Sequence, residues 1–113
     1  MYNEYIHLNM DRWTILSNCV GFDWDWGNSA KNWDKHGVTR AECEEVFFNR
    51  PVILADDARH SQDERRFRVL GKTNAQKRMF IAFTVRRNMI RVISAREMTP
   101  EERRSYKRHE KKK

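Results

Sequence analysis

The chain is poor in the residues that mark several kinds of site. It has four glycines, two prolines and two cysteines among 113 residues. The glycines are scattered, which excludes a glycine-rich phosphate loop. Cys19 and Cys43 stand in no metal-ligand spacing with histidine or carboxylate clusters, which argues against the common zinc sites. No serine occupies an obvious nucleophile turn.

Long apolar runs are also missing. No stretch approaches the roughly 20 apolar residues of a membrane span, and no basic start followed by an apolar run suggests a signal peptide. We therefore expect a cytoplasmic protein with reduced thiols, and a Cys19–Cys43 disulfide is the less favoured alternative. At 113 residues the chain is long enough for one core, and it shows no internal repeat or interdomain linker.

Charge is abundant and unevenly distributed. Residues 1–57 hold 5 Lys/Arg and 10 Asp/Glu, a net charge of −5, whereas residues 58–113 hold 18 and 6, a net charge of +12. The C-terminal half therefore builds a basic surface, and we expect an anionic partner. A soluble surface with a basic tail is the simpler explanation, but it accounts poorly for arginines inside apolar strands.

Helices are predicted in four places. Residues 1–20 carry an apolar row at steps of three and four, and a second helix runs from Asn28 or Ser29 to about His36, before Gly37. Capping boxes at Thr39-Arg40-Ala41-Glu42 and Thr99-Pro100-Glu101-Glu102 begin two more helices. The third helix stops before Pro51, and the tail of the fourth is expected to fray.

Strands are predicted at residues 22–25, 52–55, 64–71, 79–86 and 89–95, with a tight hairpin at Arg87-Asn88. Alternation places Phe67 and Val69 opposite Arg66. Both faces of the last strand are apolar, so alternation does not place its arginines. The fold class is therefore α+β: a mostly antiparallel sheet of about four to five strands with N-terminal helices and a C-terminal helix.

The candidate chemistry combines a Lys-His pair with arginines on strands. Lys35 and His36 close the second predicted helix, and the strands carry Arg66, Arg86 and Arg96. RNA cleavage without a metal needs a proton acceptor, a proton donor and fixed cations. His36 can move a proton, and Lys35 and the three arginines can hold the phosphate.

Simpler interpretations remain open for each of these residues. His36 can be a structural hydrogen-bonding residue, and Lys35 can be solvated. Arg66 can pair with Asp63 or Glu64, and Arg96 with Glu97.

A set of motifs resembles the BrnT family, the toxins of BrnT/BrnA-type bacterial toxin–antitoxin systems. It begins with Phe22-Asp23-Trp24-Asp25, Asn32 and Lys35-His36-Gly37-Val38. It continues, in order, with Val46-Phe47, Glu64-Arg65-Arg66, Gly71, Thr84-Val85-Arg86, Ile90-Arg91-Val92-Ile93-Ser94-Ala95-Arg96, Glu102-Arg103 and Tyr106.

The resemblance implies a RelE-like fold and a metal-independent endoribonuclease that inhibits translation. It also implies a BrnA-like ribbon-helix-helix antitoxin, with operator DNA bound only through the toxin–antitoxin complex. The family's catalytic positions fall on Lys35, His36, Arg66, Arg86 and Arg96. We assign RNA binding to Arg65, Arg68, Arg87 and Arg91, and we expect no cofactor, metal or membrane partner.

The expected organisation is an N-terminal extension at 1–20, a toxin domain at 21–107 and a basic tail at 108–113. The extension's apolar row would leave a large exposed patch if it were free, so we expect it to dock on the domain or on a second copy. The first helix, an open sheet edge and the antitoxin groove are the candidate surfaces. The alternative function is a catalytically inactive module that binds nucleic acid or antitoxin, or a basic protein that binds polyanions without specificity.

Overall fold

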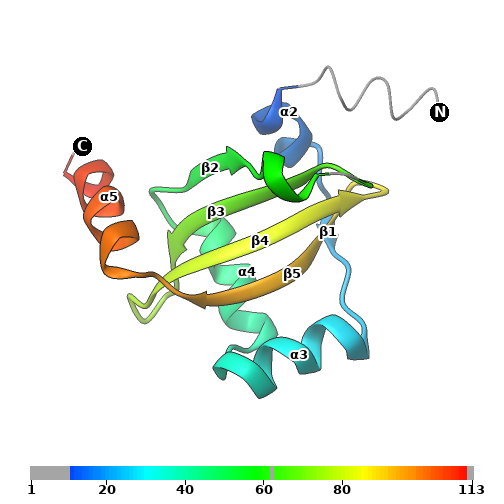
Figure 1. Cartoon of the computed structure of the whole chain (residues 1–113), viewed down its shortest axis with the longest axis horizontal. Helices are drawn as coiled ribbons and strands as arrows, with labels where there is room; N and C mark the ends of the chain where they lie inside the picture. The colour runs from blue at the N-terminus through cyan, green and yellow to red at the C-terminus, as the bar shows by residue number, and fades with distance from the viewer. Residues whose placement is uncertain (1–10, 62, 112–113) are drawn as a thin grey trace.

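The α+β architecture is confirmed in the computed structural model of the chain, which describes residues 11–61 and 63–111 without the side chains of residues 31, 32, 34 and 35. Five strands form one sheet in the order β1-β5-β4-β3-β2 (Figure 1). β1 runs parallel to β5, and the other pairs are antiparallel. Within the described part of the chain, no helix is long and apolar enough to cross a membrane.

The elements follow one another in a simple order. The helices are α2 (Arg12–Ser17), α3 (Trp26–His36), α4 (Arg40–Phe48), the short 3-10 helix η1 (Ala58–His60) and α5 (Pro100–Glu110). The strands are β1 (Gly21–Phe22), β2 (Ile53–Asp56), β3 (Arg66–Lys72), β4 (Arg78–Arg86) and β5 (Met89–Glu97).

Local chemistry fixes several of these boundaries as predicted. Both capping boxes form, with Glu42 and Glu102 each bonded reciprocally to the threonine three residues earlier. Gly37 has a φ of 66°, which suits the end of α3. Arg87 and Asn88 have φ values of 54° and 60°, so the β4–β5 hairpin turns where the sequence indicated.

The start of α3 differs from the prediction. The helix begins at Trp26, and the residue that caps its N-terminus is Asp25, not Asn28 or Ser29. The Asp25 carboxylate accepts a hydrogen bond from the Asn28 backbone N–H at 3.0 Å, and the Asn28 amide oxygen accepts one from the Asp25 N–H at 2.8 Å. Because the turn begins at residue 25, the strand predicted over 22–25 is reduced to Gly21–Phe22.

The sheet has a buried inner face and an open outer face. The inner face packs against α4 over a core that includes Val46, Val69, Ile81 and Phe83, and Figure 1 shows α4 passing behind the sheet. The predicted burial of Phe67 and Val69 on β3 is confirmed, and β4 buries alternate residues from Met79 to Phe83. A Cβ on Gly71 would lie 2.6 Å from a Val46 methyl carbon, so a residue without a side chain permits the close approach of α4.

A register shift between Ala82 and Phe83 explains why the alternation of apolar residues did not show which face of the sheet each residue of β5 occupies. Val92 pairs with Phe83 on the inner face, and Arg91 and Arg96 pair with Thr84 and Phe80 on the outer face. Both arginines therefore share the outer face with Arg66 and Arg68.

The two ends of the chain depart from the predicted pattern. Tyr2, Ile6 and Met10 lie outside the described residues. Of the other residues in the predicted apolar row, Trp13 is 45% exposed and Val20 is 82% exposed. Ile15, which is not part of that row, is buried at 4% exposure. At the other end, α5 continues to Glu110 inside the predicted tail, and the Glu110 carboxylate pairs with Lys72 and Arg78.

Candidate active site

Arg66 and Arg86 meet at one end of the outer face. Arg66 begins β3 and pairs in register with Thr84, and Arg86 ends β4 two residues later. The Thr84 hydroxyl donates a hydrogen bond of 2.7 Å to the Arg65 carbonyl, which ties the two strands together at this end. The fold thus brings together two arginines that are 20 residues apart in the sequence.

A cleft of about 470 Å³ opens beside this pair. It lies between the loop that follows β2 and the ends of β3 and β4. It is lined by Arg59, His60, Asp63, Glu64, Arg66 and Arg86. Three guanidinium groups, two carboxylates and an imidazole therefore border one open volume, and such groups are suited to acid–base chemistry on a phosphodiester.

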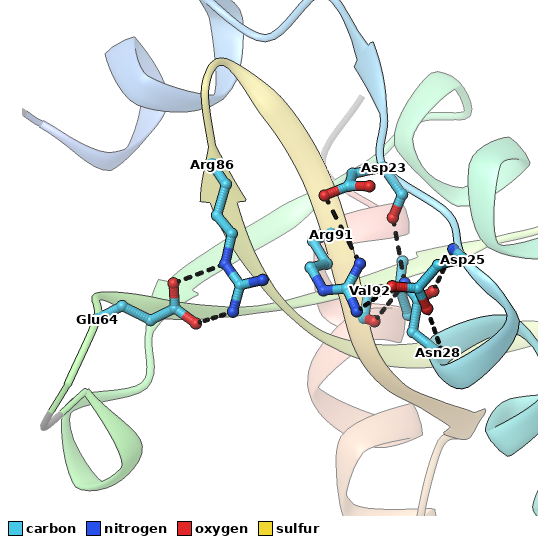
Figure 2. Close-up of polar contacts among 7 residues, drawn as sticks. All are labelled: Asp23, Asp25, Asn28, Glu64, Arg86, Arg91 and Val92. Atoms are coloured by element: carbon cyan, nitrogen blue, oxygen red, sulfur yellow. Dashed lines mark hydrogen bonds and ion pairs between the residues drawn. The ribbon is translucent and has the colours of Figure 1, made fainter.

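Arg86 and Glu64 form a two-bond ion pair across the cleft. Arg86 Nε and Nη2 donate to the two Glu64 oxygens at 3.0 and 2.8 Å (Figure 2). The hydrogen bonds from Arg86 hold the pKa of Glu64 below its usual value, and the same bonds raise the pKa of Arg86. Glu64 is therefore an ionised carboxylate at neutral pH, and Arg86 is oriented by it.

His60 is oriented by a second carboxylate. Its Nδ1 lies 3.0 Å from an Asp57 oxygen, and the side chain is 64% exposed. A carboxylate on Nδ1 fixes the tautomer and leaves Nε2 as the nitrogen available to a substrate. His60 was not among the residues predicted from the sequence. The available signal was a histidine three residues after an aspartate, in the loop that leads to Glu64-Arg65-Arg66.

Arg91 lies on the side of Arg86 that faces away from Glu64 (Figure 2). Its guanidinium lies 2.8 Å from an Asp25 oxygen and 3.6 Å from an Asp23 oxygen (Figure 2). The Asn28 side-chain amide donates to the Asp23 carbonyl at 3.2 Å and to the Val92 carbonyl at 3.1 Å. The segment before α3 is thus anchored to β5 through one buried amide.

A second cleft, of about 370 Å³, adjoins the first through Arg86. It lies at the β4–β5 turn beside the end of β1. It is lined by Phe22, Asp23, Trp24, Arg86, Arg87 and Met89. Arg87 is exposed there, as its place in the turn requires.

Arg96 lies at the far end of the outer face. It pairs with Phe80, six residues before Arg86 on β4, which corresponds to about 20 Å along a strand. Its guanidinium donates to both Glu102 oxygens at 2.8 and 3.1 Å and lies 4.1 Å from the centre of the Phe80 ring. Arg96 therefore joins α5 to the sheet and is separated from the cleft of Arg66 and Arg86.

His36 is also separated from that cleft. It is exposed in the last turn of α3, whereas the contacts of α3 with Arg91 and Val92 come from its first turn. In Figure 1 the C-terminal end of α3 lies toward the end of β5, opposite the β4–β5 turn. The Lys35 side chain lies outside the described residues. The catalytic assignment of Lys35 and His36 stays a prediction.

The two remaining arginines assigned to RNA binding have different surroundings. Arg65 donates to Asp56 at 2.8 Å and lies 5.2 Å from the centre of the Phe67 ring. Arg68 is exposed at the middle of the outer face. Among the described residues, no group of three or more His, Cys, Asp and Glu side chains is arranged to hold a metal.

Comparison with known proteins identifies the family. The family model described as the ribonuclease toxin BrnT of type II toxin–antitoxin systems matches residues 24–102. The chain belongs to the BrnT family. The resemblance seen in the sequence is confirmed, and the BrnT match includes Lys35, His36, Arg66, Arg86 and Arg96.

Solved structures include a BrnT with a similar fold. The 1.1 Å crystal structure of the Brucella abortus ribonuclease toxin BrnT has a TM-score of 0.53 with this chain at 21% sequence identity. The similarity covers 71% of this chain and 97% of the Brucella chain. No curated protein matches at the sequence level.

Membership of the BrnT family makes the chain a ribonuclease toxin of a type II toxin–antitoxin system, so its substrate is RNA and its partner is an antitoxin. The match begins after β1 and ends in the first turn of α5. Helix α2 lies before the matched residues, so it is an element outside the region that the family model describes.

Proposed function

We propose that the protein is a metal-independent endoribonuclease that cuts RNA in the cleft of Arg66 and Arg86, and that this cleavage inhibits translation. The observation that carries the proposal is the gathering of Arg59, Arg66 and Arg86 around His60 and Glu64 in one cleft. These groups supply cations for the phosphate and two proton-transfer groups, so the reaction requires no metal.

The cleavage step follows from the ionisation of these groups. The RNA 2′-OH loses its proton to a base and attacks the adjacent phosphorus, and the 5′-oxygen leaves with a proton from an acid. Glu64 is ionised and suits the base once Arg86 turns to the phosphate, because the hydrogen bonds from Arg86 that lower its pKa also weaken it as a proton acceptor. His60 suits the acid, because the Asp57 carboxylate holds its Nδ1 and leaves Nε2 as the nitrogen that can face the 5′-oxygen. The products are a 2′,3′-cyclic phosphate and a 5′-hydroxyl.

The arginines act on the phosphate. Arg86 is bound to Glu64 in the free protein, so a substrate phosphate must take over part of its guanidinium. This exchange frees Glu64 to accept the 2′-OH proton at the moment the phosphate arrives. Among the described residues no carboxylate lies within ion-pair distance of Arg66, which gives the phosphate a second cation.

The test uses purified protein and single-stranded RNA in EDTA. We expect cleavage with 2′,3′-cyclic phosphate ends, and we expect His60→Ala and Arg66→Ala to lower the rate by about 100-fold or more. His36→Ala is the matched control, because it removes a histidine that also ends a helix but lies at a distance from the cleft. A folded protein that cuts no RNA would contradict the proposal. Loss of activity in H36A with full activity in H60A would move the site to Lys35 and His36.

The alternative is a catalytically inactive module that binds RNA or antitoxin. One observation favours it: Arg86, Arg91 and Arg96 all carry carboxylate partners. Such a module would bind RNA with an affinity that falls steeply with salt, and its H60A variant would bind equally well. Absence of turnover in the wild type together with RNA binding would select this alternative.

We also propose that the antitoxin is a BrnA-like ribbon-helix-helix protein and that operator DNA is bound only through the complex. The BrnT family match supports a type II antitoxin as partner. Co-expression with a ribbon-helix-helix protein from a neighbouring reading frame tests this, because the expected complex is stable and RNA cleavage is suppressed in it.

A further inference from the structure

We propose that the 370 Å³ cleft at the β4–β5 turn binds the nucleobase next to the scissile phosphate, with guanine preferred and Asp23 as the specificity-determining residue. This inference rests on the proposed ribonuclease function and extends it to substrate choice. The two clefts share Arg86 as a lining residue. A phosphate on Arg86 therefore brings an adjacent nucleoside to the mouth of the second cleft.

Asp23 is the carboxylate that can leave its present partner. Its side chain is 41% exposed, and its contact with Arg91 is 3.6 Å long. Arg91 keeps a shorter contact of 2.8 Å with Asp25, so it stays paired when Asp23 turns to a ligand (Figure 2). The Asp23 backbone stays fixed meanwhile, because its N–H donates to Ile90 and its carbonyl accepts from Asn28.

The donors of the bases decide which one fits. Guanine presents two adjacent N–H donors, at N1 and N2, and a carboxylate accepts both at once. Cytosine and adenine present an amino donor beside a bare ring acceptor, and uracil presents one donor between two acceptors. The other edge of guanine carries the O6 and N7 acceptors that pair with arginine.

The remaining lining residues suit a base as well. Arg87 is exposed at the turn, and among the described residues it has no carboxylate partner within ion-pair distance. A guanidinium plane can stack on a base or donate to its acceptor edge. Phe22, Trp24 and Met89 add apolar surface to the same cleft. The cleft therefore offers an acceptor, a donor and apolar walls, as recognition of a splayed-out base requires.

The experiment compares Asp23→Asn with Asp25→Asn as a matched control. Short single-stranded RNAs that differ at the nucleotide beside one cleavage point give the ratio of cleavage next to guanosine to cleavage next to uridine. We expect wild type to favour guanosine and D23N to lower the ratio about 10- to 100-fold, the discrimination typical of a bidentate base contact. D25N weakens the shorter contact of Arg91 and leaves Arg91 closer to Asp23, so it is expected to lower the ratio much less than D23N does.

Binding of guanosine and uridine 3′-monophosphates is measured in parallel by calorimetry. Tighter binding of the guanosine nucleotide that D23N abolishes supports the inference even if wild type cuts no RNA, and in that case only the ribonuclease proposal fails. Equal binding of both nucleotides, or an unchanged base preference in D23N, overturns the inference. A loss of preference in D25N as large as in D23N also overturns it, because Asp23 would then act only by positioning Arg91.

Discussion

At the scale of single residues, Asn28 shows how one buried side chain can organise a functional surface. The residue is 7% exposed. Its amide joins the Asp23 carbonyl, the Val92 carbonyl and the Asp25 N–H, so it holds the start of α3 against β5. The sequence indicated Asn28 as a helix cap. Its contact with a strand 64 residues away could not be read from local chemistry.

Replacing Asn28 is expected to destabilise the protein. Asn28→Ala leaves the Val92 carbonyl, which is buried, and the Asp25 N–H, which is part-buried, without their partner, which costs about 1–3 kcal/mol. Urea unfolding measures the loss. Ser29→Ala is the control, because the Ser29 hydroxyl only accepts an exposed bond from Arg40 and should cost less than about 0.5 kcal/mol. Equal losses of unfolding free energy in the two variants would mean that the hydrogen bonds of the Asn28 amide contribute no more stability than the exposed bond of Ser29.

At the scale of helices and strands, prediction succeeded where the determining chemistry is local. Both capping boxes, the positive φ at Gly37 and the Arg87-Asn88 turn depend on residues within four positions of each other. It failed where distant contacts decide. The shift at Ala82/Phe83 sets which face of β5 the arginines occupy, and the pairing of β4 with β5 produces it.

Helix α2 is the element that the sequence placed least well. Of the predicted row, Leu16 packs against the core as expected, but Trp13 is 45% exposed and the side chain buried in the core is that of Ile15. Arg12 donates to the Leu54 carbonyl at 3.2 Å, so α2 packs on β2, the edge strand of the sheet. An open sheet edge was one of the three surfaces expected for this segment, and a cap on it limits pairing with other chains.

This placement predicts unequal effects of two neighbouring substitutions. Ile15→Ala removes a side chain that is 4% exposed and is expected to cost about 2–4 kcal/mol. Trp13→Ala, at a position 45% exposed, should cost less than about 1 kcal/mol. Thermal unfolding of both variants measures this difference. A larger loss of stability in W13A than in I15A would contradict the packing of α2 on β2 through Ile15 and would support the predicted apolar row instead.

At the scale of the whole molecule, the candidate cleft combines arginines that the sequence singled out with a histidine that it did not. Arg66 and Arg86 were predicted from their strands, and the antiparallel pairing of β3 with β4 brings them together. His60 lies in an irregular loop with no periodic signal, so only the folded chain places it in the same cleft. His36 was assigned through the family resemblance, and α3 places it at a distance from that cleft, so its catalytic role stays a prediction.

The distribution of charge has a consequence for stability as well as for binding. Four glutamates are paired with cations on other elements or at strand ends: Glu42 with Lys77, Glu64 with Arg86, Glu102 with Arg96, and Glu110 with Arg78 and Lys72. The Thr39 backbone N–H lowers the pKa of Glu42, and Arg86 lowers that of Glu64. Burial would raise the pKa of Glu102 and Glu110, but hydrogen bonds from Arg96 and Arg78 outweigh it, so both values are lowered.

These shifts predict how the free energy of unfolding depends on pH. A carboxylate whose pKa is lowered on folding stabilises the protein above its unfolded value of about 4.3, and this contribution is lost as pH falls through the folded value. The contribution of these four glutamates to the free energy of unfolding should therefore be constant between about pH 5 and 7 and should fall below about pH 4. Each exposed or half-exposed pair contributes about 0.2–1 kcal/mol. The double variant Glu64→Gln/Glu110→Gln should be less stable at pH 7 and lose less than wild type between pH 5 and 3, as chemical unfolding at each pH measures. An equal loss in both proteins over that range would mean that these two pairs do not link the sheet to its loop and to α5 energetically.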